Sequence, residues 1–293
     1  MTAERRVRAL SFWSGPIELT PLQGGVSNAS FTVKDQTGKY VARVGHDYPF
    51  HHVFRDAEVI TSRAAHDVGL SPEVVYTEPG LIVVRFIEAR TYSEADVRRN
   101  ASRCVDIVKR CHRDLGARVS GRVNFFWVFH VLRDYFRTIS IASHSRVPEI
   151  SRWAHEVKRM EKAQVPLPIV FGHHDLLPTN FMDDGTRLWL IDWEYGGFGT
   201  AMFDLASIAS NNQFDEKAER DLLARYFEKT PDEAMLRSFY AMKTASALRE
   251  AVWGMVSEIH LNAPGVDYVA YAQEYLSRYE RVLGDYNTKF GMT

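Results

Sequence analysis

The fold of this 293-residue chain is decided by one segment, Phe171-Gly172-His173-His174-Asp175-Leu176-Leu177-Pro178-Thr179-Asn180-Phe181. It places an aspartate and an asparagine five positions apart on a tight loop. A second aspartate, Asp192, ends the apolar run 188–191, which predicts a short strand. This spacing is typical of phosphoryl-transfer sites. In such sites one aspartate orients and deprotonates a hydroxyl, while the asparagine and the other aspartate hold Mg²⁺ on nucleotide phosphates. Asp and Asn supply the oxygen ligands that a hard cation prefers.

Two plainer interpretations compete with this one. Asp, Asn and Pro are common in ordinary turns, so Asp175 or Asn180 alone would indicate little. The combination of His173, Asp175, Asn180 and Asp192 at the expected spacing favours a kinase-like site. A metal-hydrolase reading of the His-His-Asp run is weaker, because adjacent histidines on a turn point in different directions and no HExxH helix accompanies them.

Composition is that of an ordinary globular protein, with 45% apolar and 25% charged residues and a net charge of −1. There is no global basic field that would attract nucleic acid or an anionic membrane. No uncharged run of 18 residues and no N-terminal apolar segment occurs, so we expect a cytoplasmic protein without integral membrane association. The two cysteines, Cys104 and Cys111, lie two helical turns apart in an expected helix, too far for a disulfide. They are expected to be buried thiols.

The segment 19–33 predicts a strand–turn–strand hairpin whose turn contains Gly24-Gly25-Val26-Ser27-Asn28. Glycines let backbone N–H groups approach phosphate oxygens, and Ser27 and Asn28 add side-chain donors. A plain hairpin turn is the simpler alternative, since the segment is neither a G-x-G-x-x-G motif nor a Walker A loop.

The next strand, Lys39–Val44, carries a cation, Arg43, on the face opposite to Val44. Arginine binds phosphate bidentately and stays charged. A helix over 55–69, closed by Gly69 at its C′ position, offers Glu58 as the acid that pairs with this cation.

Two further strands are predicted at Glu73–Thr77 and Leu81–Ile87, joined by a Glu-Pro-Gly turn. The chain leaves the sheet near residue 88, where a hinge between two lobes is expected. Backbone groups around Ile87 and Ala89 would then face an adenine.

The rest of the chain is predicted to be mainly helical. Asp204 is expected to open one helix as its N-cap residue. The other expected helices are Asp96–Leu115, Val123–Ile141, Pro148–Lys162, Asp215–Phe227, Asp232–His260 and Val266–Val282.

These segments together resemble the choline/ethanolamine kinase branch of the aminoglycoside-phosphotransferase-like kinases. The resemblance runs from about residue 20 to residue 280 and is most specific at Ile191-Asp192-Trp193-Glu194-Tyr195-Gly196-Gly197. It includes Gly24–Asn28, Arg43, Glu58, the segment 171–181, Asp204-Leu205-Ala206 and, more faintly, Trp253 and Asp267–Ala272.

The resemblance implies an α+β, bilobal protein-kinase-like fold. Residues 1–88 would form a small nucleotide-binding lobe, an antiparallel sheet with one helix, and residues 89–293 a larger, mainly helical lobe for catalysis and substrate binding. It also implies ATP and Mg²⁺ as cofactors and a small cationic amino alcohol, choline or ethanolamine first, as the phosphate acceptor. The oligomeric state is not implied.

Site roles follow from the same matching motif positions. Asp175 would be the base, and Asn180 and Asp192 the Mg²⁺ ligands. Arg43 and Glu58 would clamp the phosphates, with Ser27 and Asn28 covering the nucleotide.

A quaternary ammonium has no hydrogen-bond donor and binds through cation–π contact, so it needs an aromatic cage. The resemblance implies Tyr195, Trp253 and Tyr271 for this cage, with Glu194 as a nearby acid. Glu250 stands where the family often places another aromatic residue, and this departure bears on whether choline is the substrate.

Four alternatives stay open. The substrate could be thiamine, an aminoglycoside or another amino alcohol. The chain could also be a catalytically silent kinase-like binding protein, although such proteins typically lose the base or a metal ligand, and all three of these side chains are present here.

Overall fold

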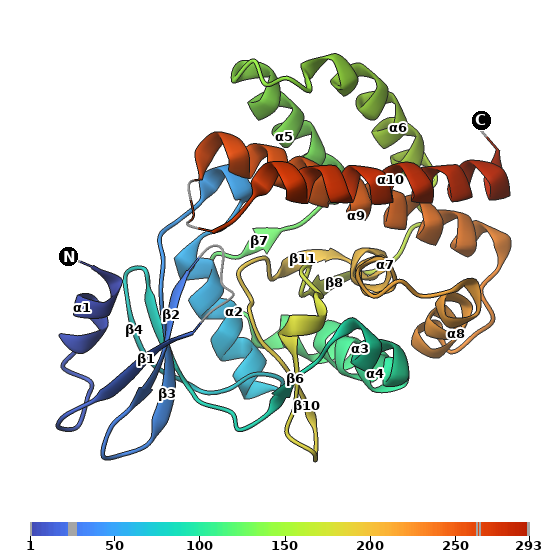
Figure 1. Cartoon of the computed structure of the whole chain (residues 1–293). Coiled ribbons are helices and arrows are strands. Elements are labelled where there is room, and N and C mark those ends of the chain that lie inside the picture. Colours follow the sequence, from blue (N-terminus) through green and yellow to red (C-terminus); the bar gives the residue numbers. More distant parts are fainter. Residues whose placement is uncertain (1, 23–27, 262, 264, 292–293) are drawn as a thin grey trace.

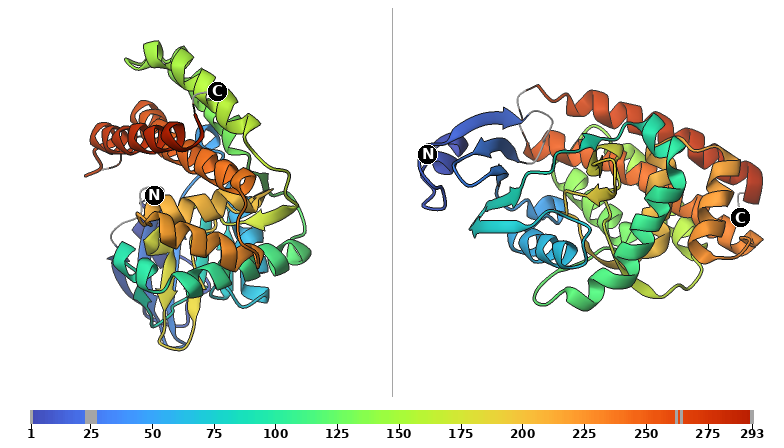
Figure 2. Two further views of the ribbon diagram at one scale, coloured as in Figure 1. Left: turned by 90° about the vertical axis from the view of Figure 1, so that its right-hand side faces the viewer. Right: turned by 90° about the horizontal axis from the view of Figure 1, so that it is seen from below.

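The computed structural model describes residues 2–22, 28–261, 263 and 265–291. A five-stranded sheet lies at one end of the molecule, and a larger, mainly helical part extends away from it, with the two termini at opposite ends (Figures 1 and 2). The small lobe and the large lobe of the expected bilobal α+β fold are both recognisable. The boundary between residues 88 and 89 stays a prediction.

The five-stranded sheet has the order β1 (Glu18–Leu22), β2 (Ala29–Lys34), β3 (Lys39–Val44), β5 (Leu81–Arg85) and β4 (Val74–Glu78), and all its pairs are antiparallel. Phe31, Val33, Tyr40 and Ala42 are buried on one face, at alternate positions of β2 and β3. This period of two is the pattern that predicted strand 39–44. The strand expected over 81–87 is also present, although β5 ends two residues earlier than expected.

Two helices accompany this sheet. The short α1 (Ala3–Arg8), which the sequence did not suggest, buries Val7 in the core of the sheet. The longer α2 (Arg55–Asp67) ends where expected, since Gly69 follows it with a φ of +70°. The inner residues Ala64 and Ala65 of α2 belong to the large apolar core of the helical part, so α2 joins the two parts of the molecule.

The helical part is built around α9 (Glu233–His260), most of whose residues are buried. It packs against α5, α6, α7 and α10, and α10 lies along it (Figure 1). The helices of this part are α3 (Glu94–Arg99), α4 (Ala101–Arg110), α5 (Val128–Ile141), α6 (Ile150–Lys162), α7 (Ala201–Asn211), α8 (Glu216–Phe227), α9 and α10 (Tyr268–Phe290).

Two small sheets hold the loops of the site. One has the order β10 (Leu188–Leu190), β9 (Phe181–Asp183), β6 (Arg90–Thr91). The other has the order β7 (Asn124–Phe125), β11 (Gly197–Thr200), β8 (Ile169–Gly172).

Three of the expected helices differ clearly from those observed. The helix expected over 96–115 is divided into α3, α4 and a π-helical turn, Cys111–Leu115. The helix expected from Val123 begins only at Val128, because residues 124–125 pair with β11 as a strand. The last helix continues to Phe290, eight residues beyond the expected end at Val282.

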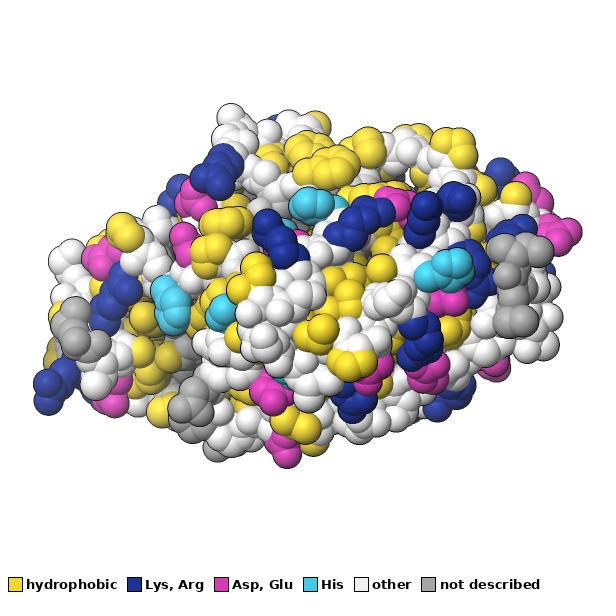
Figure 3. Space-filling view, turned by 90° about the horizontal axis from the view of Figure 1, so that it is seen from above, with side chains coloured by type: hydrophobic (Ala, Val, Ile, Leu, Met, Phe, Trp, Pro, Cys, Tyr) yellow, Lys and Arg dark blue, Asp and Glu magenta, His cyan; other side chains and the backbone are white. Residues whose placement is uncertain are grey.

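The thiols of Cys104 and Cys111 are buried and free, as expected. None of the helices formed by the described residues is long and apolar enough to span a membrane. Figure 3 shows the face over α5, α6 and α10, where basic and acidic side chains are interspersed.

Candidate active site

The loop that follows β8 is anchored by a buried carboxylate. The backbone N–H groups of His173 and His174 donate to Asp204 Oδ2 and Oδ1, each at 2.8 Å. His112 Nε2, from the π-helical turn, lies 2.9 Å from Asp204 Oδ2. The sequence predicted Asp204 as an N-cap residue, and this was wrong: Thr200 caps α7, while Asp204 sits fully buried in its first turn. Asp204 fixes the start of the loop that carries Asp175.

Removing this anchor should destabilise the protein. An asparagine in Asp204→Asn offers one oxygen where two loop N–H groups need acceptors, so one is left unpaired at a cost of about 1–3 kcal/mol. Urea unfolding at pH 7 should show this loss, whereas Asp221→Asn, on the surface of α8, should change stability by less than about 0.5 kcal/mol. Equal stability of the Asp204 variant and the wild type would contradict the anchor role.

The stability that Asp204 contributes should depend on pH. Burial alone would raise the pKa of Asp204, but its hydrogen bond with His112 and the nearby His174 lower it below the usual value. A lowered pKa means that the stabilisation is present above the unfolded pKa of about 3.9 and is lost as the pH falls below it. The stability difference between the wild type and Asp204→Asn should therefore shrink in unfolding curves measured below about pH 4.

The three predicted oxygen-bearing side chains converge. Asn180, which ends a 3₁₀ turn, donates through Nδ2 to the backbone oxygen of Asp175 at 2.8 Å and to its Oδ2 at 3.2 Å. The backbone N–H of Ile191 donates to Asn180 O at 3.1 Å, and His173 Nε2 lies 2.9 Å from Ile191 O. These bonds bring Asp192, the next residue, beside the loop of Asp175.

Arg43 connects this centre to the five-stranded sheet. Its Nη2 donates to Asp192 Oδ1 at 2.6 Å, and its Nη1 lies 3.1 Å from Glu58 Oε1. Burial alone would raise the pKa of Asp192, but the charge and hydrogen bond of Arg43 hold it below its usual value. The strand cation and the helix acid that the sequence paired are thus in contact, with Asp192 on the other side of the cation.

Cation binding is compatible with this donor set. Asn180 uses its amide nitrogen toward Asp175, and Asp192 uses Oδ1 toward Arg43. Within the described part of the chain, no hydrogen bond engages Asn180 Oδ1 or Asp192 Oδ2. Two oxygens of the types that Mg²⁺ prefers are therefore available at the centre.

Glu194 takes a different position from the one expected of a substrate acid. Its Oε2 accepts hydrogen bonds from Arg55 Nη1 at 2.9 Å and from Asn28 Nδ2 at 3.4 Å. Burial, followed by the charge of Asp192, raises the pKa of Glu194 to about 7. Glu194 faces the N-terminal sheet, where Asn28 ends the stretch that the sequence assigned to nucleotide phosphates.

Arg55 is a site residue that the sequence did not reveal. Its Nη1 donates to Glu58 Oε2 at 2.6 Å as well as to Glu194. The spacing of Arg55 and Glu58, three positions apart on one helix, was the available signal. Two arginines and three carboxylates consequently form one continuous network.

The three aromatic residues also gather. Trp253 Nε1 donates to the Tyr195 hydroxyl at 3.0 Å, and the rings of Trp253 and Tyr271 lie 5.4 Å apart at 61°. Glu250, one turn before Trp253 on α9, accepts a hydrogen bond from the Tyr271 hydroxyl at 2.9 Å. Glu250 is therefore an acid in direct contact with this aromatic cluster.

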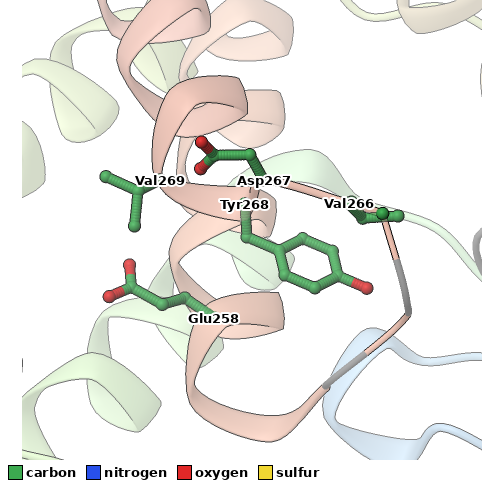
Figure 4. A pocket seen from close by; sticks show the side chains of 6 residues that line it. Glu258, Val266, Asp267, Tyr268 and Val269 are labelled. Atoms are coloured by element: carbon green, nitrogen blue, oxygen red, sulfur yellow. The ribbon is translucent and has the colours of Figure 1, made fainter.

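An open hollow of about 460 Å³ lies at the loop before α10, beside this cluster. Figure 4 shows Glu258, Asp267 and Tyr268 around it. The ring of Tyr268 is 6.3 Å from that of Trp253, so the hollow adjoins the outer side of the aromatic cluster.

The remaining predicted nucleotide contacts are less defined. Ser27 lies outside the described residues. Ile87 and Ala89 lie on the segment between β5 and β6, and β6 pairs with β9, the strand that directly follows Asn180. This segment joins the five-stranded sheet to the loop of the site, and its contact with an adenine stays a prediction.

Comparison with known proteins agrees with this geometry. The sequence profile of the choline/ethanolamine kinase family matches residues 19–241. Protein LicA of Haemophilus influenzae is 27% identical over 216 residues, which cover 71% of this chain and 62% of LicA. The match therefore spans less than two-thirds of that relative.

Two solved structures are similar over almost the whole chain. A choline/ethanolamine kinase family protein from Mesorhizobium loti is 26% identical, with a TM-score of 0.76 and coverage of 99% of this chain and 98% of that one. The choline kinase LicA from Streptococcus pneumoniae is 21% identical, with a TM-score of 0.76 and coverage of 97% of both chains, and shares the fold.

These findings confirm the expected kinase-like fold and, at the level of the family, the expected phosphotransferase that acts on an alcohol. The chain belongs to the choline/ethanolamine kinase family.

Proposed function

We propose that this protein is an ATP- and Mg²⁺-dependent kinase that phosphorylates the hydroxyl of a small amino alcohol, with choline and ethanolamine as the first candidates. The observation that carries the proposal is the convergence of Asp175, Asn180 and Asp192 beside the Arg43–Glu58 pair. The choline/ethanolamine kinase family, whose profile matches residues 19–241, supports the class of acceptor.

Each side chain has a role that its position supports. Asp175 orients the substrate hydroxyl and accepts its proton. Arg43 stays charged, because its pKa is raised further: burial opposes the charge, but Asp192 and Glu58 outweigh that effect. It can therefore bind phosphate oxygens, and Glu58 holds it in place. Mg²⁺, held by Asn180 and Asp192, would neutralise charge on the transferred phosphoryl group.

The test is a panel of purified protein, ATP and Mg²⁺ with choline, ethanolamine, thiamine and an aminoglycoside, read as ADP formed and as phosphorylated product. Turnover of choline or ethanolamine is the expected result. Turnover of thiamine or an aminoglycoside alone would replace the first candidates, and ATP binding without any product would favour the silent alternative.

A cytoplasmic location also stays a prediction.

Trp253→Ala should discriminate between types of amine. If Trp253 contacts a quaternary ammonium by its ring face, its loss should raise KM for choline by roughly 3- to 30-fold and change KM for ethanolamine less. Trp189→Ala is the matched control, since Trp189 lies on β10 against Arg187 and Asp184. An equal rise of KM for both amines would contradict a cation–π cage.

A further inference from the structure

Arg249 on α9 is a buried cation beside the predicted base. Its side chain is 2% exposed, and its guanidinium carbon lies 4.6 Å from the centroid of the Tyr195 ring. Asp175 lies close enough for the charge of Arg249 to act on it, opposing the effects of burial and of Glu250, which raise the pKa of that carboxyl. Arg249 therefore makes a cation–π contact with Tyr195 at a short distance from the predicted base.

Only one edge of this guanidinium is paired. Nη1 donates to Glu250 Oε1 at 2.5 Å, whereas Nε and Nη2 have no hydrogen-bond partner among the described residues. These two nitrogens form the side-on edge that binds a carboxylate with two parallel hydrogen bonds. Arg249 also acts on Tyr135, where it opposes the rise in the pKa of the hydroxyl that burial causes, but neither unpaired nitrogen meets this hydroxyl in hydrogen-bond geometry.

Both oxygens of the neighbouring acid are already engaged. Glu250 accepts from Arg249 through Oε1 and from the Tyr271 hydroxyl through Oε2. The Nε–Nη2 edge is thus a buried pair of donors near Asp175, and a buried donor without a partner costs free energy that a ligand acceptor recovers.

We infer that the alcohol phosphorylated at this site carries a carboxylate, which the Nε–Nη2 edge of Arg249 binds. The inference rests on the proposed function and narrows it: Arg249 is a specificity-determining residue, and a hydroxy amino acid suits the site better than choline or ethanolamine. The transfer itself is unchanged, with the hydroxyl proton going to Asp175, the new P–O bond forming at the substrate oxygen, and ADP leaving.

The experiment compares pairs of alcohols that differ only by the carboxylate, ethanolamine with serine and 3-aminopropanol with homoserine. 3-Hydroxypropionate, which lacks the amine of serine, shows whether the amine is also needed. The readout is kcat/KM with ATP and Mg²⁺ for the wild type, Arg249→Met and Arg249→Lys. Melting temperature and ATP binding report whether each variant is folded.

The wild type should prefer the carboxylated member of at least one pair by about 10²-fold or more, since a site built to bond a group rejects the analogue that lacks it. Arg249→Met should lose this preference, and Arg249→Lys, which keeps the charge without the planar fork, should keep only part of it. Should Arg249→Met not fold, the wild-type ratios and Arg249→Lys still decide the matter.

Two results would overturn the inference and are distinguishable. Turnover of ethanolamine or 3-aminopropanol at least equal to that of serine and homoserine would overturn it and leave the proposed function standing. Absence of turnover for every alcohol, in protein that binds ATP, would overturn both.

Discussion

Asp175→Asn is expected to lower kcat by roughly 10²- to 10⁴-fold, the usual contribution of a general base. The amide has nearly the same shape as the carboxylate, and Asn180 can still donate to the backbone oxygen of residue 175. The ability to accept the proton of the substrate hydroxyl is lost, together with the negative charge of the carboxylate. Steady-state kinetics with the best substrate of the panel measures the effect.

The pH dependence of kcat/KM should also change in Asp175→Asn. Burial, followed by the charge of Glu250, raises the pKa of Asp175 well above its usual value. The wild-type kcat/KM should therefore rise with pH as this carboxyl deprotonates, and the variant should lack that limb of the profile.

The stability of Asp175→Asn provides the control for its loss of kcat. Because the pKa of Asp175 is higher in the folded than in the unfolded protein, the carboxylate opposes folding increasingly as the pH rises above about 3.9. Asp175→Asn should then be at least as stable as the wild type at pH 8 in urea unfolding. A variant that is stable and retains most of kcat would remove Asp175 from the role of base.

Asp192→Asn is the second change with a large expected effect. It removes one negative charge from the pair of predicted metal ligands and from the contact with Arg43 at 2.6 Å. We expect kcat/KM to fall by at least about 10²-fold, since even partners that only orient a metal ligand cost 10- to 100-fold. The Mg²⁺ concentration for half-maximal activity should rise as well.

A magnesium titration of wild type and variant measures this shift. Asp285→Asn, at an exposed position of α10, is the matched control for the loss of one carboxylate and should behave like the wild type. If Asp192→Asn lost activity without any shift in its Mg²⁺ requirement, Asp192 would act through Arg43 rather than as a metal ligand.

Local patterns accounted for a large part of the fold. Alternating apolar residues placed the strand 39–44, and Gly69 marked the end of α2, because both features depend on neighbours a few positions away. The spacing of Asp175, Asn180 and Asp192 likewise singled out the three side chains that the structure brings together.

Such local patterns could not predict the backbone conformation at the site. His174 and Asp192 both have positive φ, at 61° and 68°, which residues other than glycine rarely adopt. Such conformations persist only where surrounding contacts enforce them. Here those contacts include the hydrogen bond from the backbone N–H of His174 to Asp204 and the hydrogen bond from Arg43 to Asp192.

The sequence by itself determined the family, most of the longer strands and helices, and the residue types that chemistry requires. Tertiary structure alone decided that residues 124–125 form a strand, that Asp204 anchors a loop and that Glu194 faces Arg55. It alone decided that the Nε–Nη2 edge of Arg249 is left unpaired beside Tyr195. The reason is physical: each of these outcomes depends on partners 30 or more positions away in the chain, whose approach no local periodicity records.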